Sequence, residues 1–248
     1  MSVHRFFAPS LDPGDEAVDL PRDEAEHLTR VLRLGVGDTV SVFNGRGHEF
    51  LARIVSAARR DARVQLLSRV EPAPESTTPL TLVQAALKGD KMDDVIRDAV
   101  MLGVAAIQPI VSKRTEYTVA ALLRGARMER WRRIALASAK QSRRAVVPEI
   151  MMPLTLETWL DEPAPGERLM FVEPGIDGVE PLSSFRNAGA PSSAALIVGP
   201  EGGWDPAECA RARARGLRFV SLGGRTLRAD AVAIAALSVL QFLWDHSC

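Results

Sequence analysis

The sequence predicts an α/β fold in which a small, mostly β domain precedes a larger domain built on a parallel sheet. Residues 1–72 contain short apolar runs separated by turn residues. A proline-rich segment follows, and beyond it apolar runs alternate with helical patterns. Strand–helix alternation of this kind is typical of a mostly parallel sheet with helices on both faces. We therefore place a first domain at 1–72, a linker at 73–79 and a second domain at 80–248.

The first domain carries a strong hairpin signal. The apolar run 40–43 leads directly into Asn44-Gly45-Arg46-Gly47, and Asn-Gly is the dipeptide most typical of a tight β-turn. Further strands are expected over 50–55 and 63–67. A helix is expected over 23–32, with acidic residues in its first turn. The linker contains three prolines between Val70 and Pro79, which indicates a stiff connection.

The second domain is expected to contain five strands and four helices. The strands are predicted over 80–85, 105–110, 169–172, 194–198 and 217–222. The helices are predicted over 91–102, 120–144, 206–215 and 230–244. Asp205 followed by Pro206 is a helix start signal, because Asp caps the first turn and Pro suits the first helical position. The apolar final helix fits either a core or an interface.

Two of these strands stop abruptly at glycine-rich loops. One loop is Gly199-Pro200-Glu201-Gly202-Gly203, and the other runs from Leu222 to Leu227. Parallel strands end at one edge of a sheet, and ligands of open α/β sheets bind at that edge. Neither loop continues into Gly-Lys-Ser/Thr, and the Gly-x-Gly-x-x-Gly spacing is missing. The loops thus predict a ligand pocket but disfavour a nucleotide hydrolase.

The charge is balanced overall but uneven along the chain. Lys+Arg and Asp+Glu both number 31, whereas between Val111 and Pro148 ten basic residues face two acidic ones. Of the basic residues 27 are arginine, which can fork onto phosphate and stack on bases, as RNA binding requires. A biased genome composition explains the same excess equally well.

The sequence predicts a cytoplasmic protein without a membrane segment. The N-terminal residues lack the apolar core of a signal peptide. The longest mostly apolar stretch, Ala231 to Trp244, is too short to span a bilayer. Only Cys209 and Cys248 occur, without metal-ligand spacing, so we expect a reducing compartment and no metal site.

The two glycine loops carry a family resemblance. Ile197–Gly203 together with Leu222–Arg228 resembles the C-terminal signature of the SPOUT-class RNA methyltransferases, and specifically of the ribosomal RNA small subunit methyltransferase E family. Further matches keep the family's order and spacing along nearly the whole chain: Arg5-Phe6-Phe7, His27–Arg33, Phe43–Gly47, Lys88–Met92, Leu102–Val104, Gln141–Arg143 and Pro148.

The resemblance implies a PUA-like RNA-binding β-barrel followed by an α/β domain with a deep C-terminal trefoil knot. It implies that S-adenosylmethionine binds in a bent form among three strand-end loops, with glycines allowing close backbone approach. These loops lie near Val172-Glu173-Pro174, at Gly199–Gly203 and at Leu222–Leu227. The implied cofactor-binding residues are Val172, Gly199, Glu201, Gly202, Gly203, Leu222, Gly223, Gly224, Thr226 and Leu227. It also implies a homodimer that acts on 16S ribosomal RNA within the small ribosomal subunit.

The implied reaction is methyl transfer to N3 of a uridine. Arg228, directly after the second loop, is the candidate for stabilising the anion formed on the base, and Asp230 is the candidate proton acceptor. A structural ion pair is the alternative for both. The candidate RNA contacts are Arg5, Arg30, Arg33, Arg143 and Arg144.

Several positions depart from the family pattern. Ala229-Asp230-Ala231-Val232 stands where the family usually reads Thr-Glu-Thr-Ala, so that two hydroxyls are lost and the carboxylate arm is shorter. Met101 and Lys140 replace glutamates, and Lys113-Arg114-Thr115 replaces Glu-Arg-Ser. Two alternatives therefore stay open: a related enzyme that methylates a ribose 2′-oxygen, and a non-catalytic ribosome-assembly factor.

Overall fold

The computed structural model describes residues 3–58, 60–163 and 165–244. The chain forms two compact units: Met1–Glu75 together with Ala139–Val147, and Ser76–Ser138 together with Pro148–Cys248. The sequence assigned residues 139–147 to the second domain, whereas in the structure they pack with the N-terminal residues. A unit boundary thus falls inside a helix as well as in the linker.

The N-terminal unit is built on a five-stranded sheet with the order β1-β3-β4-β5-β2. Its strands are β1 (Arg5–Phe7), β2 (Ala17–Asp19), β3 (Thr39–Phe43), β4 (Glu49–Ala58) and β5 (Asp61–Val70). The predicted hairpin is confirmed, because β3 and β4 pair antiparallel across it. Phe6, Val42, Ile54 and Val64 lie in the core of this sheet. The predicted helix over 23–32 is α1 (Arg22–Glu26), which continues as a π-helical turn over His27–Val31.

Polar contacts explain why residues 139–147 pack in the N-terminal unit. The Arg5 guanidinium forms a paired ion contact with Glu49, with nitrogen–oxygen distances of 2.9 and 2.7 Å. It also donates to the carbonyl of Lys140 at 2.8 Å and to that of Arg144 at 3.1 Å. The Lys140 ammonium in turn reaches both carboxylate oxygens of buried Glu24 at 2.8 Å. Arg5 is therefore the centre of the packing between β1 and this segment.

The larger unit contains a sheet with the order β11-β13-β10-β12-β6-β7-β8, all of whose neighbours pair in parallel. Its strands are β6 (Leu80–Ala85), β7 (Ala106–Val111), β8 (Glu149–Ile150), β10 (Glu167–Phe171), β11 (Glu180–Pro181), β12 (Ala194–Val198) and β13 (Arg218–Ser221), and β9 (Leu154–Thr155) also pairs with β7. The predicted α/β architecture with a parallel sheet is confirmed.

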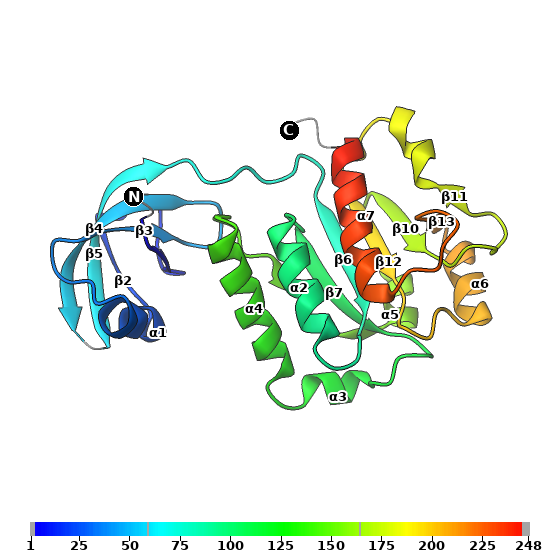
Figure 1. Cartoon of the computed structure of the whole chain (residues 1–248), viewed down its shortest axis with the longest axis horizontal. Coiled ribbons are helices and arrows are strands. Elements are labelled where there is room, and N and C mark those ends of the chain that lie inside the picture. Colours follow the sequence, from blue (N-terminus) through cyan, green and yellow to red (C-terminus); the bar gives the residue numbers. More distant parts are fainter. Residues whose placement is uncertain (1–2, 59, 164, 245–248) are drawn as a thin grey trace. The chain divides into compact units, whose positions relative to one another are not determined.

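Helices cover both faces of this sheet. On one face α2 (Lys91–Met101) packs against α7 (Ala229–Trp244), which also contacts β12 and β6 (Figure 1). On the other face α5 (Leu156–Asp161) and α6 (Pro206–Ala214) cover a core that includes Val83, Met170 and Ile197. The start of α6 is as predicted, since Asp205 accepts from the Ala207 N–H and Glu208 completes the capping box.

The prediction of one continuous helix over 120–144 is wrong. The structure has two helices, α3 (Val119–Leu123) and α4 (Arg127–Gln141), separated by Arg124-Gly125-Ala126. Gly125 has a φ of +83°, which is a left-handed conformation that interrupts a right-handed helix. Thr118 caps α3 by accepting from the Ala121 N–H.

The short elements escaped prediction. These are β1, β2, β8, β9 and β11, together with α5 and a 3₁₀ helix over Leu182–Asn187. Each spans at most six residues, which is too short for an apolar period to appear in the sequence.

None of the helices within residues 3–58, 60–163 and 165–244 combines the length and the hydropathy that crossing a membrane requires.

Arg5→Ala tests the packing of the N-terminal unit. The substitution leaves Glu49 buried without its cation, which costs about 3 kcal/mol in comparable buried pairs, because the side chains of Arg5 and Glu49 are only 11% and 6% exposed. Hydrogen–deuterium exchange of peptides from β3 and β4 should show a lower free energy of local opening. Arg30→Ala, an exposed arginine of the same unit, is the control, and equal protection in the two variants would contradict the prediction.

Candidate functional site

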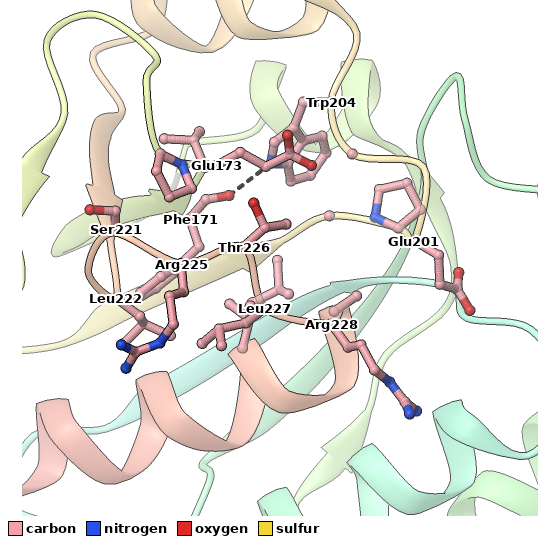
Figure 2. Close-up of a pocket in the computed structure, with 18 of the residues that line it drawn as sticks. Phe171, Glu173, Glu201, Trp204, Ser221, Leu222, Arg225, Thr226, Leu227 and Arg228 are labelled. Atoms are coloured by element: carbon pink, nitrogen blue, oxygen red, sulfur yellow. Dashed lines mark hydrogen bonds between the residues drawn. The ribbon is translucent and has the colours of Figure 1, made fainter.

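Three strand-end loops enclose a cavity of about 300 Å³ in the larger unit (Figure 2). Strand β10 lies between β12 and β13 and is parallel to both. Because the three strands are parallel, their carboxyl ends meet at one edge of the sheet. The consecutive strands β12 and β13 lie on opposite sides of β10, so the strand order reverses there. Such a reversal of strand order is where open α/β sheets bind ligands.

Eight of the ten predicted cofactor-binding residues line this cavity. They are Val172, Gly199, Glu201, Gly203, Leu222, Gly223, Thr226 and Leu227. Gly202 and Gly224 belong to the same loops but lie outside the lining. The three predicted strand ends are thus brought together as expected.

Trp204 fixes the geometry of the loop after β12. Its indole N–H donates to the Phe171 carbonyl at 2.8 Å, which ties this loop to the end of β10 (Figure 2). The ring lies so close to Gly199 that a Cβ there would stand 2.9 Å from its Cε2 atom. Gly199 is therefore required by the tryptophan beside it.

Two further glycines are required by backbone conformation. Gly203 has a φ of +69°, and a Cβ there would meet the Glu173 carboxylate at 3.0 Å. Gly223 has a φ of +112° and open space around it, and L-residues rarely adopt that conformation. The expectation that all these glycines make room for a ligand is corrected at Gly199 and Gly203, where protein atoms occupy the space.

The loop after β13 leaves its backbone polar groups available. Among the described residues, the N–H and C=O groups of Gly223–Leu227 have no hydrogen-bond partner. Backbone groups that face a cavity can pair with the polar edge of a bound ring. The apolar walls, which include Phe171, Val198 and Val232, suit the faces of such a ring.

Glu201 connects the cavity to the start of α2. Its carboxylate accepts from the Lys91 ammonium at 2.9 Å and from the Lys88 backbone N–H at 3.2 Å. Burial alone would raise the pKa of Glu201, but these hydrogen bonds and the Lys91 charge outweigh it and lower the pKa below its usual value. The contact therefore stabilises the folded loop at neutral pH and is lost as the pH falls through the lowered pKa.

The two predicted catalytic residues form an ion pair with each other. Arg228 Nε and Nη2 donate to the two carboxylate oxygens of Asp230 at 3.0 and 2.7 Å. Arg228 lines the cavity and its side chain is 71% exposed, whereas Asp230 lies in the first turn of α7 outside the lining. In Figure 2 the Arg228 guanidinium points away from Glu173 and Trp204, toward the outside of the cavity.

The five arginines predicted to contact RNA fall into two groups. Arg30, Arg33 and Arg143 are exposed, and the last two adopt left-handed backbone conformations. Arg5 and Arg144 are largely buried in ion pairs with Glu49 and Glu75. Those two guanidinium groups stabilise the N-terminal unit, and RNA contact stays a prediction for all five.

Sequence reasoning did not single out several lining residues. Trp204 and Arg225 line the cavity, as does Glu173, whose loop was expected there. Arg114, which follows β7, donates to the Gly202 carbonyl at 2.9 Å. Its position after a strand end was a usable signal, whereas the role of Trp204 depends on a partner 33 residues away in the sequence.

In the part of the chain that the structure describes, His, Cys, Asp and Glu side chains form no group of three or more that could hold a metal ion. Cys209 is half-buried, and burial raises the pKa of its thiol. Cys248 lies outside the described residues.

The family models and the relatives agree with this architecture. An RNA methyltransferase domain matches residues 74–241, and an RNA methyltransferase PUA domain matches residues 20–67. Ribosomal RNA small subunit methyltransferase E from Synechocystis sp. is 34% identical over 93% of this chain and 75% of its own length. The protein of that name from Mycobacterium bovis is 31% identical over 98% of this chain and 94% of its own.

A solved structure shows the same fold over the whole chain. The ribosomal RNA small subunit methyltransferase E from Neisseria gonorrhoeae, bound to S-adenosyl methionine, is 30% identical with a TM-score of 0.87 and covers 100% of both chains. Together with the matched RNA methyltransferase domain, these similarities show that the chain belongs to the ribosomal RNA small subunit methyltransferase E family.

Proposed function

We propose that this protein transfers a methyl group from S-adenosylmethionine to N3 of a uridine in 16S ribosomal RNA of the small subunit. The observation that carries the proposal is the cavity formed by three strand-end loops, because the family's characteristic loops line it. Membership of the family supports methylation of ribosomal RNA. The uridine N3 target rests on the sequence resemblance.

The cavity fits the cofactor in size and chemistry. Its volume of about 300 Å³ lies at the lower end of the range for small-molecule sites, about 300–1,000 Å³. The unpaired backbone groups of Gly223–Leu227 suit the hydrogen-bonding edge of adenine, and apolar residues such as Val198 and Leu227 suit its faces. The lining carboxylate Glu173 suits the positively charged end of the cofactor, whereas the Glu201 carboxylate is paired with Lys91.

The proposed chemistry needs little from the protein beyond placement and charge. S-adenosylmethionine supplies an already electrophilic methyl group, so holding the uridine in line with it supplies much of the rate. Loss of the N3 proton would leave negative charge on N3 and the base oxygens. N3 would then take the methyl group as the S–CH₃ bond breaks and the neutral thioether leaves. Arg228 would stabilise that charge, and Asp230, held at 2.7 Å from Arg228, would accept the proton.

The Arg228–Asp230 ion pair forms despite the departure from the family sequence at Ala229-Asp230-Ala231-Val232. Ala229 is buried at the start of α7, and Asp230 still reaches Arg228 with both oxygens despite its shorter arm. The pair therefore provides a cation and an acceptor next to the cavity without the two hydroxyls. The same contact is the structural ion pair named above as the alternative role, and the Arg228→Ala variant distinguishes the two roles.

The wider proposal includes a trefoil knot, a barrel-like RNA-binding N-terminal unit and a homodimer in the cytoplasm. The position of β13 between β10 and β11, with α7 returning against β6 and β12, supports the knot. The outer face of α7 supports the dimer, because Phe242 is 82% exposed and Val239 is 37% exposed beside it. The exposed residues Arg30, Arg33 and Arg143 support the RNA surface.

The proposed reaction predicts label in one nucleoside. Incubation of the protein with labelled S-adenosylmethionine and small ribosomal subunits that lack the modification should label 3-methyluridine, identified by digestion and mass spectrometry. Label in a 2′-O-methyl nucleoside would replace the target atom with a ribose oxygen. Absence of label, with subunits that a known relative methylates, would favour an assembly factor.

Arg228→Ala should separate catalysis from cofactor binding. Removing one transition-state charge donor lowers kcat by about 10²–10³-fold in comparable sites, while the cofactor Kd should stay near that of the unmodified protein. Arg186→Ala removes an exposed arginine elsewhere in the larger unit and should keep full activity. Turnover unchanged in Arg228→Ala would remove this residue from the mechanism.

Gly199→Ala should weaken cofactor binding through Trp204. The added methyl group forces the indole or the loop to move, and overpacking of this kind costs about 1–3 kcal/mol, which corresponds to about 5- to 150-fold in Kd. Isothermal titration with S-adenosylmethionine measures the change. Gly189→Ala, at an open position without positive φ, is the control, and an equal Kd for both variants would contradict the role assigned to Trp204.

A further inference from the structure

A second, arginine-lined cavity of about 460 Å³ lies in the larger unit, between the loop before α2 and the α3–α4 region. It is lined by Leu87, Gly89, Asp90, Met92, Asp93, Tyr117, Arg124, Ala126, Arg127, Arg130, Trp131 and Arg133. The function proposed above uses none of these residues. Four arginines and two aspartates line the cavity, which leaves an excess of positive charge.

The arginines are gathered by the local fold. Arg127, Arg130 and Arg133 recur at every third position of α4 and therefore follow one side of the helix. Arg124 joins them because Gly125 breaks the helix that the sequence predicted. The break turns a basic helical segment into one wall of a hollow.

One of the four arginines is paired with carboxylates of the cavity wall, and the other three are not. Arg130 pairs with Asp90 at 3.0 Å and with Asp93, and the Trp131 indole N–H donates to Asp93 at 3.0 Å. Of the carboxylates that the structure places, none lies within ion-pair distance of Arg124, Arg127 or Arg133. This contrasts with Arg97, Arg211, Arg215 and Arg218 of the same unit, which all pair with carboxylates.

The cavity also contains an aromatic support. The Arg127 guanidinium lies over the Tyr117 ring at 4.3 Å from its centroid, and both residues are half-buried. A guanidinium covered by a ring on one side offers its other side for stacking. Unpaired RNA bases stack on arginine planes and aromatic rings, while free guanidinium groups bind phosphate.

The cavity adjoins the cofactor cavity along the chain and in space. Gly89 and Asp90, on its wall, directly follow Lys88, whose backbone N–H donates to Glu201 of the cofactor cavity. Lys91 makes the second contact to the same carboxylate. Lys88 and Lys91 thus connect the two cavities, and an RNA strand bound at both would pass this contact.

We propose that the arginine-lined cavity is a subsite that binds an unpaired nucleotide flanking the methylated one, with its phosphate at Arg124 and Arg133 and its base stacked on Arg127. This proposal rests on the RNA substrate of the proposed function. It adds a specificity element outside both the cofactor loops and the N-terminal unit.

The test compares two double variants with equal loss of charge. Arg124→Ala/Arg133→Ala removes the two proposed phosphate contacts. Arg132→Ala/Arg186→Ala removes two exposed arginines outside the cavity, one of them on the same helix. Binding of a protein-free 16S RNA fragment is measured over a range of salt concentrations, together with KM, kcat and the cofactor Kd.

The subsite variant should bind the RNA fragment about tenfold less tightly than the control variant, with a salt dependence smaller by about one to two phosphate contacts. The KM for RNA should rise accordingly, while kcat and the cofactor Kd stay unchanged. Equal RNA affinity in the two variants would overturn the proposal. So would weaker binding to whole subunits alone, since the cavity would then bind a ribosomal protein.

The readouts keep the two proposals distinguishable. RNA affinity is measured without turnover, so lost affinity in the subsite variant supports the subsite even if the unmodified protein transfers no methyl group. Methyl transfer by both variants with equal KM would leave the proposed function intact and reject the subsite.

Discussion

The hydrogen bond from the Trp204 indole to the Phe171 carbonyl is the interaction on which the site depends. It joins the loop after β12 to the end of β10, and so sets the distance between two of the three loops around the cavity. The ring that makes this bond occupies the space a side chain would need at Gly199. Glu173, next to the same strand end, imposes a similar restriction on Gly203. A dense arrangement of protein atoms thus shapes the cavity.

The predictable part of the fold follows from strong local signals. Asn44-Gly45 between two apolar runs specifies a hairpin, and Asp205-Pro206 specifies a helix start. The glycine loops after β12 and β13 were placed correctly at the cavity because parallel strands must end at one edge. The helix break at Gly125 does not follow from the sequence, since a single glycine is tolerated inside many helices. Short strands such as β8 depend on pairing with distant residues.

The arginines show the limit of sequence reasoning most clearly. Arg5 and Arg144 look like RNA contacts in the sequence, yet each guanidinium is largely buried and paired with a glutamate, Glu49 for Arg5 and Glu75 for Arg144. Arg30, Arg33 and Arg143 are exposed. Whether an arginine stabilises the fold or stays free to contact RNA depends on whether the fold places a carboxylate beside it. Such partners lie 44 and 69 residues away for Arg5 and Arg144, beyond the reach of any local pattern.

The membership of residues 139–147 in the N-terminal unit affects how this chain can be divided. That unit contains a β-bridge between Gly45 and Val146, and a backbone hydrogen bond from the Gly47 N–H to the Ala145 carbonyl. A gene fragment that stops in the proline-rich linker would encode the sheet without these partners. Arg5 would also lose its hydrogen bonds to the carbonyls of Lys140 and Arg144. The unit is therefore discontinuous in the gene and is not a transferable module. Recombination that exchanged it between relatives would have to preserve two separate stretches of sequence at once.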